Sequence, residues 1–88
     1  MGGRTTMEII YSPSVIKKLK RINPRDKSKI RKKIEVLKSD PLAGKALKGE
    51  LKDLRSLKAW PLRIIYLFNP KHKVINIVAI DYRGSVYK

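Results

Sequence analysis

The side chains in this sequence that could carry chemistry are basic or phenolic, and they gather in its C-terminal half. They are Lys48, Arg55, Lys58, Arg63, Tyr82, Arg83 and Tyr87. Lysine and arginine bind phosphate oxygens through charge-assisted hydrogen bonds, and tyrosine rings stack on nucleic-acid bases. The set therefore suits a polyanionic partner, RNA above all.

Other residues that mark enzyme sites are scarce. The single histidine, His72, falls in a predicted turn, where an imidazole is normally solvated. The chain has no cysteine, no cluster of histidine and carboxylates, no glycine-rich phosphate loop, and no serine with a base close in sequence. The sequence therefore predicts no metal site and no cofactor, and any reaction would depend on lysine, arginine and tyrosine.

The overall charge favours the same partner. Lysine and arginine total 22 against 7 aspartates and glutamates, which gives a net charge of +15. Such self-repulsion destabilises a small domain, so the excess should have a use. The charge content of a thermophile would include matching acids, which are missing here. An acidic protein is an alternative partner, and a membrane surface is disfavoured because no helix pairs a basic face with an aromatic apolar one.

Hydrophobic periodicity predicts the elements that position these residues. Strands are expected at residues 8–11, near 54–59, at 63–68 and at 74–80, and helices at 13–22 and 24–39. Ser12 and Asn23 are suited to cap the two helices, since a proline follows each. Residues 42–50 are expected to form a loop, and residues 81–88 a polar tail.

The order β-α-α-β-β-β predicts an α+β fold. The N-terminal strand and a helical hairpin would pack on one face of an antiparallel sheet, and the other face would be open or would form a concave basic surface. The apolar strand residues expected in the core are Ile64, Ile65, Leu67, Val74, Ile77, Val78 and Ile80. Residues 7–88 would form a single domain, and residues 1–6 a tag or a disordered N-terminal segment.

Five short segments resemble, in order and spacing, the RelE/ParE superfamily of bacterial and archaeal toxins. They are Leu47-Lys-Gly49, Leu54-Arg-Ser-Leu-Lys58, Leu62-Arg-Ile-Ile-Tyr66, Val74-Ile-Asn-Ile77 and Tyr82-Arg-Gly-Ser-Val-Tyr87. The resemblance covers residues 7–88. It implies a RelE-like fold and a toxin of a toxin–antitoxin pair. RelE-type members are endoribonucleases that cleave mRNA in the ribosomal A site and thereby inhibit translation.

The resemblance implies roles for individual residues. Attack of a ribose 2′-OH on the adjacent phosphate needs a base, an acid and cations for the phosphorane charge, without need of a metal. By position, Arg63 would hold the scissile phosphate, Arg83 would contact phosphate, and Tyr87 would stack on a base or orient the 2′-OH. Lys58 is expected in the strand where RelE members place basic catalytic residues. The further residues expected to contact RNA are Arg55, Lys48, Tyr82, Lys17, Lys18 and Arg21.

The sequence departs from the superfamily pattern at three positions. Tyr82 replaces a histidine, Leu62 replaces a tyrosine, and Ser56 occupies a place where a second basic residue is common. The catalytic assignment is therefore open. A ParE-like inhibitor of DNA gyrase without nuclease activity, and a catalytically decayed RNA- or antitoxin-binding homologue, are the alternatives. Arg83 and Tyr87 favour the nuclease.

The resemblance also predicts the partners: a cognate RelB-like antitoxin, a 70S-type ribosome and mRNA. The apolar margins of the basic helical region are expected to take up an antitoxin segment that folds on binding. No apolar run approaches the length of a membrane helix, and the N-terminus lacks the features of a signal peptide. A cytoplasmic location, with no membrane and no small-molecule cofactor, is therefore expected.

Overall fold

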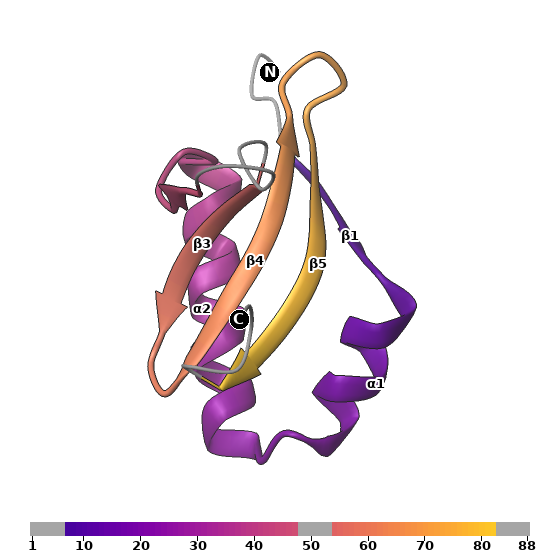
Figure 1. Ribbon diagram of the computed structural model, residues 1–88, viewed down its shortest axis with the longest axis vertical. Coiled ribbons are helices and arrows are strands. Elements are labelled where there is room, and N and C mark those ends of the chain that lie inside the picture. The colour runs from indigo at the N-terminus through magenta and orange to yellow at the C-terminus, as the bar shows by residue number, and fades with distance from the viewer. Residues whose placement is uncertain (1–6, 48–53, 83–88) are drawn as a thin grey trace, which may run out of the picture.

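A computed structural model describes residues 7–47 and 54–82 (Figure 1). The elements in chain order are β1 (Glu8–Tyr11), α1 (Pro13–Arg21), α2 (Pro24–Ser39), β2 (Lys45–Ala46), β3 (Leu54–Ala59), β4 (Leu62–Asn69) and β5 (Val74–Tyr82). The predicted α+β class is confirmed, and the predicted elements occur in the predicted order. The structure adds one short strand, β2, within the stretch predicted as a loop, and β5 continues beyond residue 80 to Tyr82.

Both helices begin directly after the predicted N-cap residues, Ser12 and Asn23. The Ser12 hydroxyl accepts a hydrogen bond from the Val15 N–H at 3.3 Å, and the Asn23 side-chain carbonyl accepts one from the Asp26 N–H at 2.8 Å. These bonds satisfy N–H groups that have no partner inside the helix. A proline follows each cap, at a position where a missing N–H costs nothing.

The five strands form one sheet in the order β1-β5-β4-β3-β2. Three of its four pairings are antiparallel, as predicted, but β1 pairs with β5 in parallel, from Glu8 opposite Val74 to Tyr11 opposite Ile77. A parallel neighbour needs a long crossover connection. Here two helices and three strands separate β1 from β5 along the chain, so β1 can join the outer edge of β5 in the same direction.

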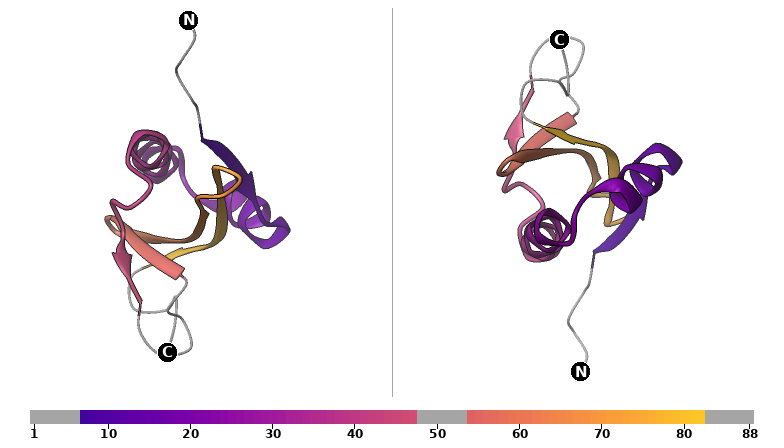
Figure 2. Two further views of the ribbon diagram at one scale, coloured as in Figure 1. Left: turned by 90° about the horizontal axis from the view of Figure 1, so that it is seen from above. Right: turned by 90° about the horizontal axis from the view of Figure 1, so that it is seen from below.

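The two helices diverge from their junction and do not pack as an antiparallel hairpin (Figures 1 and 2). Helix α2 lies against β3 and β4, whereas α1 follows β1 and continues along β5. The Ser12 N–H donates to the Ile77 carbonyl at 3.1 Å, and Lys18 Nζ lies 3.4 Å from an Asp81 carboxylate oxygen. Helix α1 therefore lies along the part of β5 that β1 does not pair, which protects a sheet edge.

Buried side chains from both helices and from β3, β4 and β5 share one core. Its buried members are Val15, Ile22, Ile30, Ile34, Leu37, Ala59, Leu62, Ile64, Tyr66, Ile75, Ile77 and Ile80. Of the strand residues predicted to be buried, Ile64, Ile77 and Ile80 lie in this core. Ile65 is buried but does not join it, and Leu67, Val74 and Val78 are half-buried. Alternation explains the difference along β4, because neighbouring residues point to opposite faces. In β5 the register shifts at Val78, which has no direct partner in β4, so Ile77 and Ile80 both reach the core although they are three residues apart.

Neither described helix is long and apolar enough to cross a membrane.

Candidate functional site

A pocket of about 270 Å³ opens between β2, β3 and β4, away from the shared core. Its lining residues are Lys45, Leu47, Ser56, Lys58 and Arg63. Three of them are cations, and none of the lining residues within 7–47 and 54–82 is a carboxylate. A small space bordered by three positive side chains is suited to a phosphate group.

The strand register brings these cations together. Lys58 of β3 lies directly opposite Arg63 of β4, and Lys45 of β2 lies opposite Ser56 of β3. Directly opposite residues have Cβ atoms about 5 Å apart, and Ser56 and Lys58 share a face because they are two residues apart. Like charges placed opposite each other are destabilising. On its other side Arg63 lies directly opposite Asp81 of β5, so these two cations share their face of the sheet with one carboxylate.

The backbone before Lys45 is anchored by Tyr66, whose ring is fully buried in the core. The Tyr66 hydroxyl accepts a hydrogen bond from the Gly44 N–H and donates one to the Pro41 carbonyl, both at 2.8 Å. The Arg55 guanidinium donates to the Gly44 carbonyl at 2.7 Å. Both polar groups of Gly44 are thus bound, so the start of β2 is held against β3 and β4.

Only glycine fits at position 44. A Cβ atom there would lie 2.7 Å from the Tyr66 ring and its hydroxyl, and 3.0 Å from the Ser56 carbonyl oxygen. Because the Ser56 carbonyl belongs to the backbone of β3, it cannot rotate away as a flexible side chain can. The close approach therefore sets the position of Lys45 relative to Ser56.

Burial raises the pKa of the Tyr66 phenol above the ordinary tyrosine value, and the hydrogen bond from Gly44 opposes this only in part. The hydroxyl therefore keeps its proton at neutral pH. It needs that proton to donate to the Pro41 carbonyl.

Two of the sequence-predicted catalytic residues, Lys58 and Arg63, lie together in the pocket. Arg55 does not, since β3 alternation places it on the other face and its guanidinium binds Gly44. Tyr82 is 45% exposed at the end of β5, opposite Leu62 in the register. By the same alternation, Tyr82 does not share a face with Arg63.

The predicted RNA contacts on α1 do not line this pocket. Lys17 and Arg21 are exposed, and Lys18 pairs with Asp81 of β5, which lies directly opposite the pocket residue Arg63. The strand order places α1 beyond β5, whereas the pocket lies on the β2 side of β4. The other predicted site residues, Lys48, Arg83 and Tyr87, lie outside the described residues.

Lys45 is the pocket residue that the sequence interpretation missed. It stands in a stretch predicted as a loop, and a two-residue strand is too short to show a period of its own. The available signal was a lysine directly after Gly44, a glycine that could have marked a close backbone approach.

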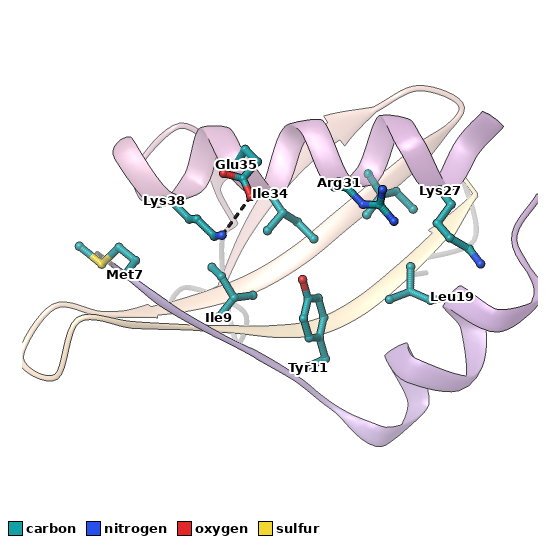
Figure 3. Close-up of a pocket in the computed structure, with 10 residues that line it drawn as sticks. Met7, Ile9, Tyr11, Leu19, Lys27, Arg31, Ile34, Glu35 and Lys38 are labelled. Carbon is teal, nitrogen blue, oxygen red and sulfur yellow. Dashed lines mark hydrogen bonds and ion pairs between the residues drawn. The ribbon is translucent and has the colours of Figure 1, made fainter. Parts of the chain in front are cut away.

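A second depression, of about 510 Å³, runs between β1, α1 and α2 (Figure 3). Its floor is apolar: Met7, Ile9, Leu19, Ile30 and Ile34, with Tyr11 of β1 pointing toward α2. The charged side chains that line it all come from α2 and are Lys27, Arg31, Glu35 and Lys38. Glu35 is already paired with Lys38 at 2.9 Å, so the net charge of this margin is positive. We call this feature the helix groove.

Within residues 7–47 and 54–82, no group of three or more histidine, cysteine, aspartate or glutamate side chains is placed to hold a metal ion.

Comparison with known proteins identifies the family. Residues 9–87 match the family model described as the ParE toxin of type II toxin–antitoxin systems, parDE. No curated protein matches the sequence. Three similar solved structures show the same fold. The RelBE2 toxin–antitoxin complex of Mycobacterium tuberculosis has a chain 22% identical, with a TM-score of 0.81, over 90% of this chain and 100% of that one.

An archaeal RelE–RelB complex from Pyrococcus horikoshii contains a chain 24% identical, with a TM-score of 0.77, over 93% and 100% of the two chains. The YoeB/ParE toxin of Agrobacterium tumefaciens is 19% identical, with a TM-score of 0.75, over 88% and 99%. The structural matches establish the fold, and the match to the family model covers nearly the whole chain. The chain therefore belongs to the ParE toxin family of type II toxin–antitoxin systems, within the RelE/ParE superfamily that its motifs resemble.

Proposed function

We propose that this toxin is a ribosome-dependent mRNA endoribonuclease that acts in the cytoplasm and is held inactive by a cognate antitoxin. The observation that carries the proposal is the placement of Lys58 directly opposite Arg63 across β3 and β4, in a pocket that Lys45 also lines.

In the proposed reaction, the ribose 2′-oxygen attacks the adjacent phosphorus and the bond from phosphorus to the 5′-oxygen breaks. The products are a 2′,3′-cyclic phosphate and a 5′-hydroxyl. One proton leaves the 2′-OH and one reaches the departing 5′-oxygen. Arg63, with its planar set of N–H donors, would hold the non-bridging oxygens, and Lys58 would stabilise the charge that grows on the phosphorane. Arg83 and Tyr87 keep the roles that the resemblance implies.

The helix groove supports the antitoxin part of the proposal. An apolar floor with a basic margin fits a segment whose apolar side chains alternate with acidic ones, and such a segment can fold as it binds. Two of the similar solved structures are toxin–antitoxin complexes. The groove lies on the helix side of the molecule, so antitoxin binding there leaves the pocket lining intact.

The test is purified protein added to ribosomes programmed with a defined mRNA. Primer extension maps the 5′ ends of the downstream fragments, and the 3′ ends of the upstream fragments are analysed chemically. The proposal expects cuts within the A-site codon and ends that carry a 2′,3′-cyclic phosphate. Intact mRNA at toxin concentrations above that of ribosomes would contradict it.

Inhibition of DNA gyrase is the second candidate, and the ParE description of the matching family favours it. It predicts loss of supercoiling activity in a gyrase assay with no change in mRNA. Both assays on the same preparation separate the candidates, because the nuclease leaves supercoiling unaffected.

A further inference from the structure

We infer that Lys45 is a third phosphate-binding cation of the pocket, which supplies from β2 the positive charge that position 56 of β3 lacks. The inference rests on the proposed nuclease function. In the superfamily pattern a second basic residue is common at the position of Ser56. Here a serine stands at that position, and the lysine comes from the neighbouring strand.

The register carries this inference. Lys45 and Ser56 are direct partners in the antiparallel pairing of β2 with β3, so their side chains leave the sheet on the same face about 5 Å apart. Both line the pocket that Lys58 and Arg63 also line. A lysine on β2 can therefore place its ammonium group in the space that a basic side chain on residue 56 would enter.

The size of residue 56 matters to this geometry. Serine is short, so it leaves room beside Lys58 for the Lys45 side chain. Two lysines on directly opposite positions would repel each other. Because only position 45 of this pair holds a lysine, that repulsion is avoided. The pocket still has three positive side chains around the phosphate: Lys45, Lys58 and Arg63.

Hydrogen bonds to Gly44, the residue before β2, fix the backbone position of Lys45. Gly44 binds the Tyr66 hydroxyl through its N–H and the Arg55 guanidinium through its carbonyl. The backbone directly before Lys45 is therefore hydrogen-bonded to β4 through Tyr66 and to β3 through Arg55. A preorganised cation costs less reorganisation when charge develops on the phosphate.

The experiment measures single-turnover mRNA cleavage on programmed ribosomes for the wild type, Lys45→Ala, Lys45→Arg and the double variant Lys45→Ala/Ser56→Lys. Lys71→Ala is the matched control, because it removes one positive charge from an exposed position in the turn after β4, at the far end of the strand from Arg63. We expect Lys45→Ala to cleave about 10²-fold more slowly, in the range for one lost stabilising group. Lys45→Arg and the double variant should each recover at least about tenfold of this loss.

A second readout separates phosphate contact from a structural role. Binding to a single-stranded RNA with 2′-O-methyl groups, which cannot be cleaved, is measured against salt concentration. Losing one phosphate contact lowers the slope of log K against log salt by about 0.7. Lys45→Ala should show that change, and Lys71→Ala should not.

The outcomes are distinct. Cleavage by Lys45→Ala within about twofold of an active wild type would overturn the inference and leave the nuclease proposal standing, and so would a double variant no faster than Lys45→Ala. A wild type that never cleaves would end the proposed function and this inference with it. Rescue by Ser56→Lys would support the exchange of charge between the two strands.

Discussion

The pocket on β2, β3 and β4 and the helix groove both present lysine and arginine, but they differ in what lies beneath the charges. The pocket is small and lined by three cations and a serine, with Leu47 as its apolar member. The groove has an apolar floor that includes Ile30 and Ile34 of the core, and its cations stand at the margin. One surface suits a phosphate, and the other suits a folded protein segment.

The difference shows that net charge alone does not define a partner. In the groove, binding energy would come mainly from apolar area, at about 25 cal/mol per Å² removed from water. In the pocket it would come from ion pairs and hydrogen bonds, which salt weakens where they are exposed to solvent. Raising the salt concentration should therefore weaken RNA binding far more than antitoxin binding.

The largest effect should follow Arg63→Ala. Removing the guanidinium takes away the phosphate donor opposite Lys58, so mRNA cleavage should fall by about 10² to 10³-fold. Arg63→Lys should recover part of the rate, because a lysine keeps the charge without the planar pair of donors. Antitoxin affinity, measured by calorimetry, should not change. A parallel loss of both properties would mean that the two surfaces are not independent.

Tyr66→Phe tests the anchor of the pocket and should destabilise the fold by about 1 to 3 kcal/mol. The change leaves the Gly44 N–H and the Pro41 carbonyl without their hydroxyl partner. Urea unfolding followed by circular dichroism gives the free energy. Cleavage should also slow, because the backbone before Lys45 would no longer be held by the Tyr66 hydroxyl. Antitoxin binding should change less, because Tyr66 does not line the helix groove. Unchanged stability would show that water replaces the hydroxyl fully.

Arg31→Glu should weaken binding of an acidic antitoxin segment by about 1 kcal/mol, because it reverses a charge on the margin of the groove. Lys33→Glu is the matched control: it lies on the same helix, is exposed, and does not line the groove. mRNA cleavage should be equal in the two variants. If both weaken the antitoxin equally, the effect reports overall charge and not the groove.

The smallest effect concerns pH. The pKa of Tyr66 is raised in the folded state, so the unfolded chain loses this proton first as the pH rises. The contribution of Tyr66 to stability is complete below the ordinary tyrosine pKa, near 10, and declines above it. Thermal unfolding between pH 8 and 11 should show the wild type losing more stability than Tyr66→Phe. Parallel curves would contradict this assignment.

The sequence determined much of the fold. Ser12 and Asn23, each followed by a proline, predicted where the helices begin, because capping hydrogen bonds are local. Runs of β-branched residues predicted the strands. The order of the five short motifs was enough to indicate the toxin superfamily. The sequence also marked Lys58 and Arg63, since both stand inside strands in recognisable motifs.

Only the tertiary structure decided how these parts combine. The parallel pairing of β1 with β5, the presence of Lys45 in the pocket and the use of Arg55 as a backbone anchor depend on register and on which face a side chain leaves. The bond between Tyr66 and Gly44 joins residues 22 positions apart. Local periodicity carries no information about partners at that distance, because hydrogen bonding and close packing between strands select them.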